Sequence, residues 1–265
     1  MTSADSPMIA QRRRHIVAWV RDHGSARVAD LSRQFGVSEV TIRNDLARLE
    51  DEGLLIRDRG GAIPAAEARP VTSLLQVDKR SAIRVDEKKR IAASAARLVR
   101  PGDTIIMDAG TTVVEMTPHL AAVPDITVVT NALNVALQVS AATAGTSARV
   151  LLLGGFVNRS SSSTLGSFAE RALAELRVDK LFLGTQAFDR THGLTDTTME
   201  IAEIKRAMIR SAREVILLAD SAKWASAGFI KVAPLSAVHK LCTDSALPED
   251  AQSALRQLGV ELMLS

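Results

Sequence analysis

The sequence predicts an α/β protein in which a small helical domain precedes a larger, mainly parallel α/β domain. Helical periodicity and one short hairpin fill residues 8–62. From Asp86 onward, short apolar runs alternate with helical segments, which is the pattern of βαβ units. A stretch containing Pro64 and Pro70 separates the two patterns. The predicted boundaries are a first domain at 8–63, a linker at 64–77 and a second domain at 78–265.

The composition is that of an ordinary globular protein. Of the 265 residues, 46% are hydrophobic and 24% are charged, which provides enough apolar surface for a core. The formal net charge of +3 is too small to indicate a nucleic-acid partner by itself. The sequence contains no apolar run of membrane-spanning length, and its N-terminus lacks the apolar core of a signal peptide. We therefore expect a cytoplasmic protein with no membrane partner.

The sequence has few cysteine and histidine residues that could form a metal site. Cys242 is the only cysteine, which excludes an intramolecular disulfide and a cysteine-rich zinc or iron–sulfur site. The five histidines are scattered, and none falls in the H-E-x-x-H spacing of a zinc helix. We therefore expect neither a metal nor a cofactor.

Two helices begin the N-terminal domain. Apolar residues recur at helical spacing in Met8–Asp22, which predicts the first helix. A second, shorter helix is predicted over Ala26–Phe35. Gly36, Val37 and Ser38 follow it as a turn, and a glycine is common in the turn between two DNA-binding helices.

A third helix and a hairpin complete this domain. Ser38 supplies the hydroxyl of an N-cap, and the helix runs from there to about Glu52. Gly53 ends the helix, as glycine ends many helices. Leu54–Ile63 reads as a hairpin with charges and glycines at its tip. This order is that of a winged helix-turn-helix, which places a helix in the major groove of DNA.

The third helix is predicted to have one apolar and one polar face. Ile42, Leu46 and Leu49 recur at i, i+4 and i+7, so they mark the apolar face. The opposite face carries Asn, Arg and Val side chains, which suit base edges. Asn pairs with adenine, Arg pairs with guanine, and Val contacts a thymine methyl group. Arginines elsewhere in the domain, such as Arg12–Arg14, suit DNA phosphates. The alternative is an ordinary solvated helix face. The candidate DNA-binding residues are Ser38, Val40, Thr41, Arg43, Asn44, Arg48, Arg57 and Arg59.

Helices and strands are expected to alternate through the second domain. The first helix spans Asp86–Val99, and later helices are predicted at Met199–Arg213 and Ala251–Leu258. Short apolar runs are typical of buried parallel strands. The predicted strands are Thr104–Met107, Ile126–Val129, Val150–Leu153, Lys180–Leu183, Val215–Ala219, Leu241–Cys242 and Val260–Leu264.

Small and hydroxyl-bearing residues follow these strands. Ligands of parallel α/β sheets bind beyond the carboxyl ends of the strands. Gly110, Thr111 and Thr112 begin a helix after the first strand, where backbone N–H groups suit a phosphate. Any one of these runs of small and hydroxyl residues is more simply explained as a helix cap or a loop. Several such runs at the same end of the sheet favour a polar pocket. The candidate effector-binding residues are Asp108, Gly110, Thr111, Thr112, Thr130, Asn131, Gly154, Gly155, Gly184, Gln186, Lys205 and Lys223.

Lys205 is the most informative of these residues. It follows Ile201 by four positions, about 40° away on a helical wheel, so it lies on the apolar stripe of its helix. A buried ammonium is costly unless it is paired or reaches water. Three explanations stay open, namely an ion pair with Asp108 or Asp220, an anionic ligand, or a side chain that extends to solvent.

Two sets of motifs identify a family when they are taken together. The first set is the run Val28–Leu46, continued by the residues of 49–62. The second set consists of Asp108–Thr112, Val128–Asn131, Leu153–Gly155, Leu183–Thr185, Gly193–Thr195, Glu203–Ile209 and Leu217–Lys223. With these motifs, nearly the whole chain resembles the DeoR family of bacterial transcription regulators. The sensor domain of that family shares the fold of ribose-5-phosphate isomerase.

This resemblance implies a DNA-binding repressor of a carbohydrate-metabolism operon. It also implies that a phosphorylated sugar or sugar-derived intermediate relieves repression, with Gly110, Thr111 and Thr112 at the phosphate and with Lys205 and Asp108 at the ligand. The family string has a second arginine where this chain has Asn44, so we expect a different operator sequence. Because one helix-turn-helix makes few base contacts, we also expect a homodimer or a higher homo-oligomer on operator DNA.

The alternative function is that of a phosphosugar isomerase fused to a DNA-binding domain. Isomerisation needs a carboxylate base beside the substrate carbon. The isomerase and many sensor relatives carry an acid two residues after the glycine of the fourth strand, where this chain has Gln186 and then Ala187. Asp108, Asp189 and Glu203 remain, but Glu203 is expected to face away from the apolar stripe of its helix. We therefore expect a regulator and no enzyme.

Overall fold

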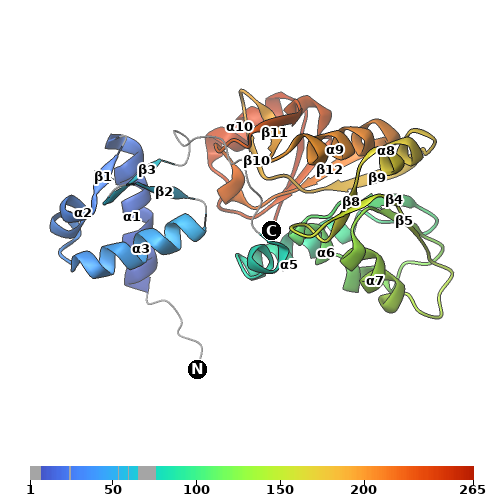
Figure 1. Cartoon of the computed structure of the whole chain (residues 1–265), viewed down its shortest axis with the longest axis horizontal. Coiled ribbons are helices and arrows are strands. Elements are labelled where there is room, and N and C mark those ends of the chain that lie inside the picture. Colours follow the sequence, from blue (N-terminus) through green and yellow to red (C-terminus); the bar gives the residue numbers. More distant parts are fainter. Residues whose placement is uncertain (1–6, 24, 53, 59, 65–75) are drawn as a thin grey trace. The chain divides into compact units, whose positions relative to one another are not determined.

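The computed structural model describes residues 7–23, 25–52, 54–58, 60–64 and 76–265 (Figure 1). The chain divides into two compact units, Met1–Arg69 and Pro70–Ser265. Each unit has its own buried apolar core. Among the described helices, none has both the length and the hydropathy that a membrane span requires.

Helices and a small antiparallel sheet make up the described part of the first unit (Figure 1). The helices are α1 (Pro7–His23), α2 (Val28–Phe35) and α3 (Glu39–Asp51). The strands are β1 (Ala26–Arg27), β2 (Leu55–Asp58) and β3 (Gly61–Pro64), and β3 lies between the other two.

The turn before α3 has the predicted features. Gly36 ends α2 with a φ of 63°, in the left-handed region that glycine adopts without strain. The Oγ atom of Ser38 accepts a hydrogen bond from the backbone N–H of Thr41 at 3.1 Å, so Ser38 is the N-cap. Gly53, which is expected to end α3, lies outside the described residues. The apolar face of α3 is buried through Ile42, Leu46 and Leu49.

The prediction that Ala26 and Arg27 belong to the second helix is wrong. Ala26 pairs with Ala62 and Arg27 pairs with Gly61, so both residues extend the wing sheet. A Cβ atom on Gly61 would lie 2.2 Å from the carbonyl oxygen of Ala26, and glycine is therefore needed for this approach. Strand pairing between distant residues overrides the local helical pattern.

A seven-stranded parallel sheet forms the centre of the second unit (Figure 1). Its strand order is β15-β14-β12-β9-β4-β5-β6, and each neighbouring pair is parallel. The predicted α/β class with a mainly parallel sheet is confirmed. The strands are β4 (Thr104–Met107), β5 (Thr127–Thr130), β6 (Arg149–Leu152), β9 (Val178–Leu183), β12 (Ala212–Leu218), β14 (Lys240–Thr243) and β15 (Glu261–Leu264).

Helices cover this sheet and bury its inner strands. Successive strand residues enter different apolar clusters, as Phe182 and Leu183 of β9 do, because side chains alternate between the faces of a strand. The helices are α4 (Val77–Ser81), α5 (Val85–Ala96), α6 (Thr111–Val114), α7 (Leu133–Ala142), α8 (Ser167–Ala174), α9 (Met199–Ser211) and α10 (Glu249–Gln257). Three 3-10 turns are η2 (Thr117–Leu120), η3 (Ser221–Lys223) and η4 (Leu235–Ala237).

Five short strands in the described part of the second unit escape the sequence prediction. β7 (Phe156–Asn158) and β8 (Ser163–Leu165) form an antiparallel pair. β10 (Ala187–Asp189), β11 (Gly193–Asp196) and β13 (Ile230–Ala233) form a separate antiparallel sheet. Runs of three or four residues are too short to show a periodic pattern, so pairing with distant strands determines them.

Candidate functional site

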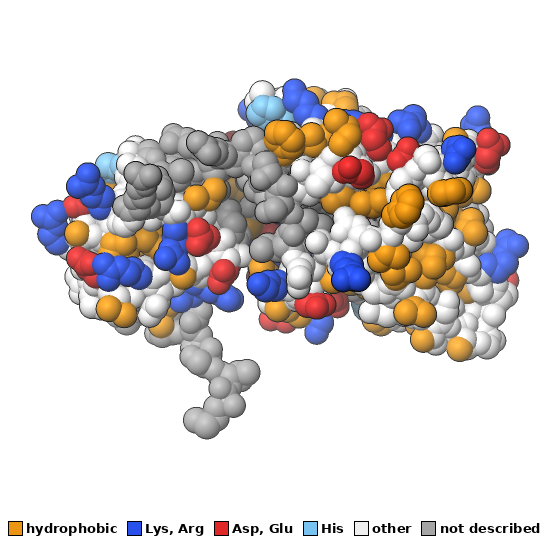
Figure 2. All heavy atoms as spheres, viewed as in Figure 1, with side chains coloured by type: hydrophobic (Ala, Val, Ile, Leu, Met, Phe, Trp, Pro, Cys, Tyr) orange, Lys and Arg blue, Asp and Glu red, His pale blue; other side chains and the backbone are white. Residues whose placement is uncertain are grey.

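The exposed face of α3 carries most of the residues predicted to contact DNA. Val40 is 63% exposed, and Arg43, Asn44 and Arg48 are also exposed. Thr41 is half-buried at the start of the helix. Figure 2 shows Lys and Arg side chains over the visible surface of the first unit, interspersed with acidic ones. The α3 face therefore presents amide, guanidinium and methyl groups together, which are the groups that read base edges.

Weak local partners hold several of these side chains. Arg43 pairs with Glu39 at 2.6 Å, and Arg48 pairs with Glu52 at 2.9 Å. Such exposed pairs contribute only about 0.3–0.5 kcal/mol, so a phosphate or a base edge can replace them. Ser38 differs from these residues because its hydroxyl caps the helix.

The hairpin contributes one described arginine to the candidate surface. The Nη1 atom of Arg57 lies 3.8 Å from a carboxylate oxygen of Glu50, and both side chains are about half exposed. The backbone N–H of Arg57 donates to the same carboxylate at 3.0 Å. Arg59, the second predicted hairpin residue, lies outside the described residues.

Two arginines that the sequence suggests as DNA phosphate contacts form ion pairs within the first unit instead. The Nε atoms of Arg12 and Arg13 lie 2.6 Å and 2.9 Å from the two carboxylate oxygens of Asp45. The Asp45 side chain is 3% exposed, so this network joins α1 to the buried face of α3. Arg14 is exposed and remains a candidate phosphate contact.

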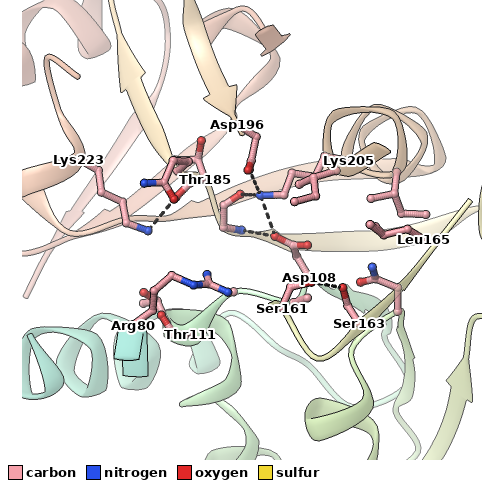
Figure 3. Close-up of a pocket in the computed structure, with 18 residues that line it drawn as sticks. Arg80, Asp108, Thr111, Ser161, Ser163, Leu165, Thr185, Asp196, Lys205 and Lys223 are labelled. Carbon is pink, nitrogen blue, oxygen red and sulfur yellow. Dashed lines mark hydrogen bonds and ion pairs between the residues drawn. The ribbon is translucent and has the colours of Figure 1, made fainter. Parts of the chain in front are cut away.

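A polar pocket of the second unit lies where β4 and β9 end (Figure 3). Asp108 directly follows β4, and Gly184 directly follows β9. A Cβ atom on Gly184 would lie 3.3 Å from the Cα atom of Gly110, so two small residues let these loops approach. The predicted residues that line the pocket are Asp108, Gly110, Thr111, Thr112, Asn131, Gly184, Gln186, Lys205 and Lys223.

Three predicted residues lie outside the pocket lining. Thr130 is fully buried, and its hydroxyl donates to the carbonyl oxygen of Met107 at 2.7 Å. Gly155 allows close chain approach, because a Cβ atom there would lie 2.4 Å from the carbonyl oxygen of Leu165. Gly154 is exposed beside it. The structure therefore gives Thr130 and Gly155 roles in the framework around the pocket.

Lys205 is at the centre of the charged network (Figure 3). Its Nζ atom lies 2.7 Å from Asp196 Oδ2 and 3.4 Å from Asp108 Oδ2, and it donates to the carbonyl oxygen of Gly184 at 2.9 Å. Burial alone would lower the pKa of Lys205, but the two carboxylates together raise it. The ion pair with Asp108 is thus confirmed, whereas the alternative pair with Asp220 is absent from the described contacts of Lys205.

The sequence does not reveal the second carboxylate partner, Asp196. This residue ends β11 and is buried, and the backbone N–H of Thr197 donates to its Oδ1 at 2.9 Å. Burial would raise the pKa of Asp196, but Lys205 lowers it, so the side chain stays ionised. The buried lysine itself signals a need for carboxylates, but β11 is too short to be placed by its sequence pattern.

Arg80 and Lys223 add positive charge at another side of the pocket (Figure 3). The Nζ atom of Lys223 donates to the carbonyl oxygen of Thr185 at 2.7 Å. Burial lowers the pKa of Lys223, and the charge of Arg80 lowers it further against the opposing effect of Asp220. Burial also lowers the pKa of Arg80, a residue that the sequence does not single out. An anion between these two cations would stabilise both protonated forms.

Two buried oxygen atoms of pocket-lining residues have no hydrogen-bond partner among the described residues. They are Thr112 Oγ1 and Asn131 Oδ1. The amide nitrogen of Asn131 is already satisfied, because it donates to the carbonyl oxygen of Thr164 at 2.9 Å. An unsatisfied buried polar atom costs about 1–3 kcal/mol. Asn131 Oδ1 can only accept a hydrogen bond, so it suits a ligand hydroxyl, whereas the Thr112 hydroxyl can also donate to an anion.

The carboxylates that the sequence leaves as candidate bases have partners in the structure, and Asp189 lies 2.9 Å from Nδ1 of His192. Gln186 lines the pocket with an amide. Asp108 is engaged by Lys205, and Glu203 is partly exposed and pairs with Arg206 at 2.6 Å. Glu203 thus has an external partner, in accord with the predicted helix face.

Two family models match the chain, one in each unit. The model of the DeoR-like helix-turn-helix domain matches residues 12–67, and that of the DeoR C terminal sensor domain matches residues 83–245. The uncharacterized HTH-type transcriptional regulator YulB of Bacillus subtilis (strain 168) is 38% identical over 96% of each chain. The HTH-type transcriptional repressor GlcR of the same organism is 33% identical over 94% of each chain.

Similar solved structures match the chain with low TM-scores. Ribose 5-phosphate isomerase A from Methanocaldococcus jannaschii is 16% identical, with a TM-score of 0.38 over 53% of this chain and 54% of that one. The eIF2B beta subunit from Chaetomium thermophilum is 16% identical, with a TM-score of 0.47 over 88% of this chain and 76% of that one.

Proposed function

This chain belongs to the DeoR family of DNA-binding transcriptional repressors, and we propose that a phosphorylated sugar or sugar-derived intermediate releases it from its operator. Family membership places the chain with transcription regulators rather than with enzymes. The regulated genes are then those of carbohydrate metabolism. The observation that carries the proposal is the polar, positively charged pocket at the ends of β4 and β9.

The charges of the pocket favour an anion. Arg80, Lys205 and Lys223 line it together with two carboxylates, which leaves one net positive charge. Lys205 and its two carboxylates together carry a charge of −1, so the positive charge of the pocket lies at Arg80 and Lys223. A phosphate monoester carries a charge of about −1.5 to −2 at neutral pH, and it therefore complements this surplus.

The hydroxyl-binding groups of the pocket favour a sugar. In the proposed complex, Gly110, Thr111 and Thr112 contact the phosphate through backbone N–H groups and hydroxyls, next to Lys223. The Asp108 carboxylate and the unsatisfied oxygen of Asn131 accept hydrogen bonds from sugar hydroxyls. A sugar without phosphate would form the hydroxyl contacts but would lack the phosphate contacts.

The first unit binds the operator through α3 in this proposal. Asn44, Val40 and Arg48 contact base edges, whereas Arg14 and Arg57 contact phosphates. A lone helix-turn-helix reads only a few base pairs, so we propose that the protein binds as a homodimer or a larger homo-oligomer.

Exposed apolar side chains on the second unit support self-association. Figure 2 shows hydrophobic side chains on the visible face of this unit. β6 is an edge strand of the main sheet, and its Leu151 and Leu152 are exposed, as are Phe156 and Val157 of β7. A monomeric mass by light scattering, both free and on operator DNA, would contradict this part of the proposal.

A thermal-shift panel tests the proposed ligand. Phosphorylated sugars are compared with their unphosphorylated parents, and we expect one phosphosugar to raise the unfolding temperature while its parent does not. A ligand at 100 times its dissociation constant stabilises the folded state by about 2.7 kcal/mol, which is readily measured.

Two variants assign the response to the pocket. Lys223→Gln removes a pocket charge and is expected to abolish most of the shift, whereas Lys231→Gln removes an exposed charge outside the pocket and is expected to retain it. Equal stabilisation by a sugar and its phosphate, or no response to any member of the panel, contradicts the proposed ligand.

A further inference from the structure

We propose that Arg80 binds the anionic group of an effector and thereby fixes helix α4 against the pocket. α4 is the first described helix after residues 65–75, which join the two units along the chain. A bound anion would therefore act directly on the element next to this connection. The inference rests on the proposed function, since it assumes an anionic effector in the pocket.

Arg80 connects α4 to the pocket physically. Its backbone belongs to the helix Val77–Ser81, while its side chain lines the pocket with Thr111 and Lys223. Figure 3 shows the Arg80 side chain extending into the pocket beside Thr111. Any ligand that contacts the guanidinium group is therefore one side chain away from α4.

Helix α4 is only partly buried. None of its residues is buried, although it is part of a well-packed unit. Val77, Asp78 and Ser81 line a cavity together with residues of α6 and α7 such as Val114 and Gln138. A helix with little buried apolar surface opens at a low free-energy cost, so its position responds to small added interactions.

Polar contacts also hold α4 to its surroundings. The buried Nζ atom of Lys88, on α5, donates to the carbonyl oxygen of Arg80. The Nη2 atom of Arg80 donates to the carbonyl oxygen of Ser160 at 3.4 Å, which is long for a hydrogen bond. A phosphate offers shorter, charge-assisted and bidentate hydrogen bonds to a guanidinium, and these are stronger than a bond to a neutral carbonyl.

Anion binding and the docking of α4 are linked equilibria. If the anion binds Arg80 only when α4 is docked, the anion must shift the population toward the docked helix. Docking α4 restricts the end of the chain that leads to the DNA-binding unit. Effector occupancy is thus transmitted through Arg80 as a change in the order of α4.

Hydrogen–deuterium exchange of the backbone amides at 77–83 tests this inference in the full-length protein. The probe is inorganic phosphate, compared with chloride at the same ionic strength and pH. We expect phosphate to slow exchange of this segment several-fold in the wild type, because α4 opens less often when Arg80 is bound. The amides near Thr111 report phosphate binding to the pocket independently.

Matched variants separate Arg80 from a general charge effect. Arg80→Gln removes the pocket charge, and we expect phosphate no longer to slow exchange at 77–83. Lys79→Gln removes an exposed charge from the same helix and is expected to behave as the wild type does. Arg80→Lys keeps a charge but loses the bidentate geometry, and we expect partial protection.

Two results would overturn the inference. The first is wild-type exchange at 77–83 that phosphate leaves unchanged, and the second is full protection in Arg80→Gln. Either result would show that anion binding at Arg80 does not order α4. If a phosphosugar still stabilises the wild type in the thermal-shift panel, the proposed function is unaffected by that result. Protection of 77–83 without a response to any phosphosugar would retain the Arg80 anion site and remove the sugar-phosphate effector.

Discussion

Asn44 is the residue on which base reading by α3 depends most directly. Its amide is exposed beside Val40 and Arg48, on the side of α3 away from the core. Asn44→Ala is expected to weaken operator binding by about 1–3 kcal/mol, because alanine cannot form the paired hydrogen bonds of an amide to adenine. Titration of labelled operator and of random-sequence DNA at one salt concentration measures the effect.

A phosphate-contacting arginine provides the contrast for Asn44. Arg14→Gln removes an exposed charge from α1, and we expect it to weaken binding to both DNAs by the same factor. If Asn44→Ala likewise weakens operator and random DNA equally, Asn44 does not read bases.

Single residues also show how far the sequence predicts the pocket. Lys205 is recognisable because a lysine on an apolar stripe needs a compensating charge, and Asp108 is one of its partners. Asp196 and Arg80 are not recognisable in this way. Asp196 comes into reach through pairing of β11 with β10 and β13, and Arg80 follows the segment predicted as a linker. Contacts that depend on long-range pairing leave no local pattern.

At the scale of elements, α5 contains a lysine whose burial makes stability depend on pH. Lys88 is 4% exposed, and burial together with the charge of Lys223 lowers its pKa to about 8, against the opposing effect of Asp220. Its ordinary pKa is 10.5, so between pH 8 and 10.5 the unfolded chain binds more protons at this residue than the folded chain. The contribution of Lys88 to the free energy of unfolding therefore rises with pH in this window.

Comparison with Lys88→Met isolates this effect. One pKa unit corresponds to about 1.4 kcal/mol, so the stability of the wild type relative to the variant should increase by about 3 kcal/mol across the window. Urea unfolding at several pH values measures both proteins. A difference between them that stays constant from pH 8 to 10.5 would show that the pKa of Lys88 is not lowered.

The main elements are predictable where burial alone shapes the sequence. Strands of a parallel sheet are covered on both faces, so β4, β5 and β12 read as apolar runs. The predicted helix Met199–Arg213 is two residues too long, because Ala212 pairs with Val178 of β9 instead. β1 fails for the same reason, since Ala26 and Arg27 pair with the wing. At the ends of elements, strand pairing with distant residues overrides the local helical propensity.

In the whole molecule, the proposed regulation requires coupling between two sites in different units. The first unit presents the α3 face, and the second contains the phosphosugar pocket that we propose. A ligand changes DNA affinity only if it binds the two states of the protein with different affinity. Coupling energies of about 1–3 kcal/mol are typical and would lower operator affinity by roughly 5–150-fold.

Release of operator DNA by the stabilising phosphosugar is the direct measure of this coupling. The operator is first isolated from genomic fragments that the protein retains, and binding to it is then followed by fluorescence anisotropy. We predict that the phosphosugar from the thermal-shift panel lowers operator affinity, whereas its unphosphorylated parent does not, and that Lys223→Gln binds the operator but is not released. Unchanged operator affinity in the presence of a phosphosugar that demonstrably binds the wild-type protein would show that the two sites are not coupled.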